Sequence, residues 1–182
     1  TEIFLPSSIT SIGNKAFYNC SKIRQIELPV SLRSIENDAF SGCTRLSQIL
    51  VQSELNSVGN KAFDGCVSLT VNGNIQKIPN NIFSECSSLS EIIIPSSVTS
   101  IGNNAFYKCS KLRQITLPLN VKNIGDRSFW GCSNLSQITI ESPNIEIGVN
   151  AFECIISLNI VGHIQKIPDN TFSGCSSLTA IT

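Results

Sequence analysis

A phenylalanine recurs eight times along the 182-residue chain, at intervals of either 23 or 20 residues. An Ile or Val lies five residues before each of them, and a cysteine follows seven of the eight at a distance of three. A period in the twenties is typical of solenoids, in which each repeat forms one turn and packs on its neighbours. The phenylalanines are Phe17, Phe40, Phe63, Phe83, Phe106, Phe129, Phe152 and Phe172. The spacing therefore predicts a single solenoid domain of about eight turns over residues 1–182.

A longer period of 89 residues lies above the short one. Shifting the chain by 89 residues superimposes the first four phenylalanines on the last four, and the string from Ile75 to Pro79 recurs from Ile164 to Pro168. We interpret the chain as a duplication of a four-turn block, with blocks at 1–89 and 90–182. Because it starts and stops within a repeat, we expect it to be a fragment of a longer protein.

Composition and charge narrow the classes of partner. Lysines and arginines number 13, as do aspartates and glutamates, so the net charge is zero and no overall field attracts nucleic acid or an anionic membrane. No run approaches the roughly 20 consecutive apolar residues that span a bilayer. We expect neither a nucleic-acid partner nor membrane contact by this chain.

Each repeat contains one segment with the pattern of a strand. Ile26 and Leu28 alternate with polar residues, which is the pattern of a half-buried strand, and Pro29 follows where a strand must end. Further along the same repeat, Leu32 and Ile35 are three residues apart, a spacing that suits either a short helix or an extended segment. The predicted class is an α/β repeat solenoid with one parallel sheet and short helical or extended return segments.

The eight cysteines recur once per repeat and contain no C-x-x-C pair. One cysteine per turn forms a column rather than a cluster of metal ligands, so we expect buried free thiols; disulfides between turns and metal binding are the alternatives. Cys154 departs from the template, since it arrives one residue early and is followed by Ile155. This turn forms either a local kink or pocket, or a tolerated change in a loop.

The pattern Leu112-x-x-Ile115-x-Leu117-Pro118, continued to Phe129 and Cys132, resembles the BspA-like, or treponemal-type, leucine-rich repeats. The resemblance covers the whole chain. It implies a curved, right-handed leucine-rich-repeat coil with its parallel sheet on the concave face and the return segments on the convex side. It also implies a surface or secreted protein of bacteria or protozoan parasites that attaches to host matrix or cell-surface proteins. The family offers no catalytic residues.

The outward side chains of the strands form the candidate binding face. One predicted column contains Glu2, Gln25, Gln48, Glu91, Gln114 and Gln137, and the column beside it contains Phe4, Glu27, Leu50, Thr70, Ile93, Thr116, Thr139 and Asn159. We expect these columns, apart from Thr70 and Asn159, to bind a protein or glycan ligand such as a host matrix protein, with Phe4, Leu50 and Ile93 as apolar anchors. The plainer alternative is that Gln and Thr simply suit an exposed sheet.

Catalysis is not expected, and neither is a cofactor or a metal. The chain has one histidine, His163, and its glycines and serines occur as once-per-repeat positions rather than as a phosphate-binding loop or a triad. The predicted function is a non-catalytic adhesion or protein-binding module at the cell surface or in the secreted fraction. The alternatives are an intracellular, cytoplasmic scaffold for protein–protein interactions and a structural spacer.

Overall fold

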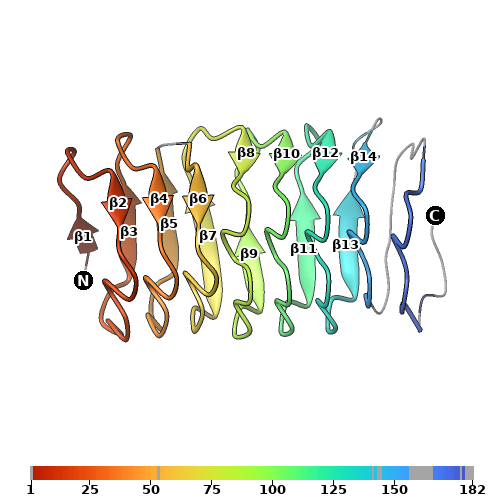
Figure 1. Ribbon diagram of the computed structural model, residues 1–182, viewed down its shortest axis with the longest axis horizontal. Helices are drawn as coiled ribbons and strands as arrows, with labels where there is room; N and C mark the ends of the chain where they lie inside the picture. Colours follow the sequence, from red (N-terminus) through yellow and green to blue (C-terminus); the bar gives the residue numbers. More distant parts are fainter. Residues whose placement is uncertain are drawn as a thin grey trace.

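The computed structural model describes residues 2–52, 54–140, 142, 145–155, 166–176 and 178. Successive turns lie side by side along the long axis of the molecule (Figure 1). The odd-numbered strands form a face that we call the broad face: β1 (Glu2–Phe4), β3 (Gln25–Leu28), β5 (Gln48–Val51), β7 (Ser68–Asn72), β9 (Glu91–Ile93), β11 (Gln114–Leu117) and β13 (Gln137–Ile140). The even-numbered, two-residue strands form the narrow face: β2 (Ser11–Ile12), β4 (Ser34–Ile35), β6 (Ser57–Val58), β8 (Lys77–Ile78), β10 (Ser100–Ile101), β12 (Asn123–Ile124) and β14 (Glu146–Ile147).

Both faces are parallel sheets, and each is divided once. The broad face contains β1-β3-β5-β7-β9 and, separately, β11-β13, whereas the narrow face contains β2-β4-β6 and β8-β10-β12-β14. The strand prediction is confirmed, because Ile26 and Leu28 are fully buried on β3 and the strand ends directly before Pro29. The curvature of the solenoid and its division into two blocks stay predictions.

The predicted α/β class is wrong, because the return segments are extended. The described residues contain no helix, and consequently no helix that could cross a bilayer. The reason is a pair of left-handed residues in every repeat, two positions before and two positions after the phenylalanine. Lys15 and Asn19 flank Phe17 with φ of 57° and 58°, and Asn104 and Lys108 flank Phe106 with φ of 53° and 55°. A right-handed helix cannot accommodate a left-handed residue every four positions.

The phenylalanines form a continuous stack through the centre of the solenoid. Neighbouring ring centroids lie between 5.0 and 6.0 Å apart, and most pairs are nearly parallel. The exception is the pair Phe63 and Phe83, which is tilted by 53° at a 20-residue interval. Six of the eight rings are fully buried, so the stack is the core that every turn shares with its neighbours.

The loops that hold the phenylalanines form a third ladder between turns. The N–H of Phe40 donates to the carbonyl of Ala62, and the N–H of Phe106 donates to that of Ser128, at 2.7 and 2.8 Å. The left-handed residue that follows behaves in the same way, since the N–H of Lys108 donates to the carbonyl of Trp130 at 2.7 Å. The two left-handed residues turn these amides along the solenoid axis, so that the loops hydrogen-bond like strands.

The cysteine column is buried in the middle of the solenoid and partly exposed at Cys20 and Cys175. All eight cysteines are free, and Cys43, Cys66, Cys86, Cys109 and Cys132 are fully buried. The Sγ of Cys109 donates to the carbonyl of Phe83 at 3.1 Å, and other thiols of the column make equivalent bonds. Cys154 does not belong to the column, because it occupies the left-handed position with φ of 66° while Ile155 fills the core place and is 1% exposed. A shift of one residue thus replaces a thiol by an isoleucine.

Asparagine side chains link the turns beside the narrow face. The Oδ1 of Asn80 accepts from the N–H of Asn103, and the Oδ1 of Asn103 accepts from the N–H of Asp126, each at 3.0 Å. In several turns a glycine directly precedes the linking Asn or Asp. A Cβ on Gly102 would lie 2.6 Å from the Oδ1 of Asn80. The recurring glycine is therefore required by the side chain of the preceding turn.

We expect Gly102→Ala to lower the free energy of unfolding by about 1–3 kcal/mol, because its Cβ would also lie 2.7 Å from the backbone nitrogen of Asn80. Gly13→Ala is the matched control, since nothing lies within 4 Å of its Cβ position, and it should change stability by less than about 0.5 kcal/mol. Urea denaturation of both variants measures the difference. Equal effects at the two positions would contradict the steric explanation.

We also expect stability to fall with alkaline pH. Burial raises the pKa of Cys43 to about 11 and that of Cys132 to about 12, so the folded chain keeps protons that the unfolded chain releases above about pH 8.5. Each such thiol should remove up to about 1.4 kcal/mol per pH unit from the free energy of unfolding between pH 8.5 and its folded pKa.

Denaturation series under reducing conditions, recorded from pH 7.5 to 10.5, measure this slope. Cys132→Ala removes one raised pKa and should make the slope shallower, whatever its effect at neutral pH. A free energy of unfolding that stays constant above pH 8.5 would show that the column does not hold its protons.

Candidate binding surface

The broad face places the predicted binding residues on its outward side. Phe4 and Ile93 are 70% and 57% exposed, although most large apolar side chains of the described residues are buried. Leu50, the third predicted anchor, is only half-buried. Glu2, Gln48, Glu91, Gln114, Thr116 and Gln137 are exposed, and Gln25, Glu27 and Thr139 are partly so. The outward orientation is therefore confirmed, whereas their role in binding stays a prediction.

The predicted columns are correct on either side of β7 and wrong across it. Gln25 pairs with Glu2 and Gln48, and Thr116 pairs with Thr139, as expected. At β7, however, Thr70 pairs with Gln48 rather than with Leu50. Thr70 pairs in turn with Ile93, so Ile93 continues the column of Glu2 instead of that of Phe4.

The physical reason is the shorter fourth repeat. Phe63 and Phe83 are 20 residues apart, three fewer than the usual 23, whereas Ile49 and its partner Val71 are 22 residues apart, only one fewer. The outward columns consequently shift by two residues at β7, and Leu50 faces Asn72. Asn159, the last residue of the predicted second column, lies outside the described residues, as does His163.

A shallow hollow opens where the broad sheet is divided. It lies between β9 and β11 and has a volume of about 410 Å³. Among the residues that line it are four that the sequence analysis selected: Glu91, Ile93, Gln114 and Thr116. The structure thus brings these four together and separates them from Phe4, which lies on the edge strand β1, four strands from β9.

Two further exposed apolar residues border the same face and were missed by the sequence analysis. Val30 and Leu119 are each 61% exposed and directly follow the prolines that end β3 and β11. Pro118, which precedes Leu119, lines the hollow. The available signal was the 89-residue period, which superimposes Val30 on Leu119 in sequence.

The broad face is weakly charged and partly hydrogen-bonded across its strands. Gln25 donates to the carboxylate of Glu2, and Gln52 donates to that of Glu27 at 2.7 Å. The carboxylate of Glu91 at the hollow has no such partner within the described residues. This surface can offer apolar contact at Ile93 with hydrogen-bonding groups around it, which is the chemistry of binding rather than of bond making.

Groups that usually bind a metal ion do not gather in the described part of the chain. No set of three or more His, Cys, Asp or Glu side chains there is placed to hold a metal ion. The buried thiols have raised pKa values through desolvation, so they are poor nucleophiles at neutral pH.

Comparison with known proteins supports the fold independently. A model of the BspA type leucine rich repeat region matches residues 1–73 and 67–179, with six copies. A leucine rich repeat protein of T. pallidum is 34% identical, with 84% of this chain and 75% of that one covered and a TM-score of 0.58. A leucine-rich repeat protein from Bacteroides ovatus is 26% identical, with 90% and 59% covered and a TM-score of 0.54. No curated protein sequence gives a significant match.

The family model covers nearly the whole chain, and the T. pallidum structure has the same architecture at substantial identity. Both agree with the parallel solenoid in which inward positions follow a fixed template. The chain belongs to the family of BspA-type leucine-rich repeat proteins.

Proposed function

We propose that the chain is a non-catalytic protein-binding module of a microbial or parasite surface protein, and that it binds host matrix or cell-surface proteins through the broad face. Repeat proteins of this kind use their extended surfaces for recognition. The surface location and the host partner follow from what the family resemblance implies. The observation that carries the proposal is the exposed Ile93 at the hollow between β9 and β11.

The burial pattern of β9 supports a functional origin for Ile93. Its neighbour Ile92 is 5% exposed and serves the core, whereas Ile93 points outward and is 57% exposed. Transferring a side chain of this size from water into an apolar contact contributes about 1.5–3 kcal/mol when burial is complete. An anchor surrounded by polar groups that exclude water is the usual arrangement of an interface hot spot.

The size of the face indicates how a partner must bind. Neighbouring strands lie about 4.8 Å apart, and each has about four residues that rise about 3.3 Å per residue. The seven strands together therefore cover about 400 Å². A stable interface buries about 800 Å² on each partner. The partner must therefore extend beyond the strands onto the adjoining loops, where Val30 and Leu119 are exposed.

The test uses the chain and a panel of immobilised fibronectin, laminin and collagen in biolayer interferometry. We expect binding to at least one of these proteins and a loss of affinity of about tenfold or more in Ile93→Lys, because a hot-spot contact is replaced by a charge. Val149→Lys is the control, since Val149 is 42% exposed and directly follows Gly148 beyond the narrow strand β14. It should bind within about twofold of the parent chain.

Equal binding by Ile93→Lys and the parent chain would remove the broad face as the binding site. If none of the matrix proteins binds the parent chain, the host-matrix proposal fails. In that case an internal scaffold or a spacer would account better for the repeat.

A further inference from the structure

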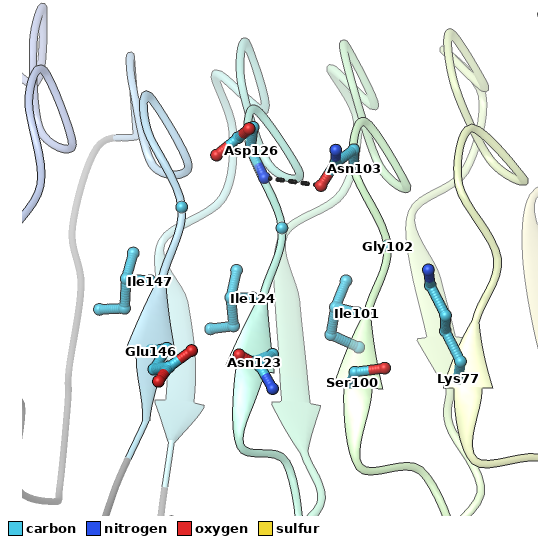
Figure 2. A pocket seen from close by; sticks show the side chains of 12 residues that line it. Lys77, Ser100, Ile101, Gly102, Asn103, Asn123, Ile124, Asp126, Glu146 and Ile147 are labelled. Atoms are coloured by element: carbon cyan, nitrogen blue, oxygen red, sulfur yellow. Dashed lines mark hydrogen bonds between the residues drawn. The ribbon is translucent and has the colours of Figure 1, made fainter.

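The narrow face carries a polar trough that the proposed protein-binding role does not use. The trough has a volume of about 400 Å³ and runs across β10, β12 and β14. Figure 2 shows Ser100, Asn123 and Glu146 in a row on one side, with Asn103 and Asp126 on the other. We propose that this trough binds a neutral, linear glycan that lies across the turns.

Glycines of three successive turns line the trough between its two polar rows. Gly102, Gly125 and Gly148 occupy equivalent positions in successive turns and line the trough. The position that a Cβ would occupy at each of them is filled by the Asn or Asp of the preceding turn, so these glycines let the turns pack closely and hold the two polar rows beside each other. The earlier turns do not repeat this arrangement. Glu36 and Pro79 occupy the equivalent position in the turns before and after that of Gly59.

The lining groups have unused hydrogen-bonding capacity. Within the described part of the chain, the side chains of Ser100, Asn123 and Glu146 make no hydrogen bond or ion pair. Asn103 and Asp126 each use one side-chain oxygen to accept a backbone N–H of the next turn, which fixes their orientation. The amide nitrogen of Asn103 and the second carboxylate oxygen of Asp126 stay available.

The chemistry of the lining favours a glycan over a protein partner. Ile101, Ile124 and Ile147 belong to the same strands but are only 2%, 2% and 7% exposed, so they offer no anchor to a protein. The available groups include both donors and acceptors, and a sugar hydroxyl can satisfy either kind. Because these groups recur from strand to strand at about 4.8 Å, they can contact an extended polymer at several points.

Charge selects a neutral ligand. One ammonium group, that of Lys77, lines the trough on β8, whereas two carboxylates, those of Asp126 and Glu146, lie on the β12 and β14 side. A polyanion such as an acidic glycosaminoglycan or a nucleic acid would be repelled by these two carboxylates, which outnumber the one ammonium group of the lining. An uncharged chain would meet no such repulsion.

The test is calorimetric titration of the chain with three neutral hexasaccharides, namely cellohexaose, β-1,4-mannohexaose and laminarihexaose. Hyaluronan hexasaccharide is the acidic comparison. We expect at least one neutral probe to bind with a Kd of about 1 mM or tighter, and more tightly than the acidic one. Asn123→Ala should weaken binding about fivefold, because it removes the hydrogen bonds of one amide.

Ser34→Ala is the matched control, since Ser34 lies at the outward position of β4 that corresponds to Asn123 after a shift of 89 residues, and outside the trough. It should bind within about twofold of the parent chain. Both side chains are surface groups, and circular dichroism checks that the variants fold. The proposal is overturned if no neutral probe binds at about 1 mM, if Asn123→Ala binds like the parent, or if the acidic probe binds more tightly than the neutral ones.

Discussion

The structure depends on the hydrogen bonds that the phenylalanine-bearing loops form from turn to turn. Left-handed residues on both sides of each phenylalanine aim the loop amides along the solenoid axis, so that the N–H of Phe129 reaches the carbonyl of Ala151 at 2.9 Å. This geometry also holds each ring over the next one. One repeated loop conformation thus pairs the backbone polar groups of the loops and also stacks the rings in the apolar core.

Such a template separates structural positions from functional ones. The inward residues of each turn are determined by the stack, the thiol column and the asparagine links, so sequence differences between turns concentrate on the outward positions. The two surfaces that we propose as binding sites both arise where the repetition is interrupted or altered. On the broad face the sheet is divided beside Ile93. On the narrow face, the position that Glu36 and Pro79 occupy in earlier turns is a glycine in three successive turns.

The sequence predicts the repeat, the strands and the inward residues well, because periodicity and burial are directly related. Ile26, Leu28 and Pro29 suffice to place β3. It leaves a helical and an extended return path both open, since Lys15 and Lys108 adopt left-handed conformations that lysine rarely shows. Glycine, asparagine and aspartate at the equivalent positions of other turns, for example Gly42 and Asp38, could have indicated the left-handed conformation. The register at β7 could not be predicted, because a deletion does not reveal which neighbouring strand absorbs it.

Native-state hydrogen exchange tests the central claim most directly, because it compares loop and strand amides in one experiment. If the loops form a true ladder, the amides of Phe40, Phe106 and Phe129 exchange as slowly as those of β3 and β5, to within about tenfold. Exchange of these loop amides at the rate of exposed turns, while the strand amides stay protected, would contradict the account.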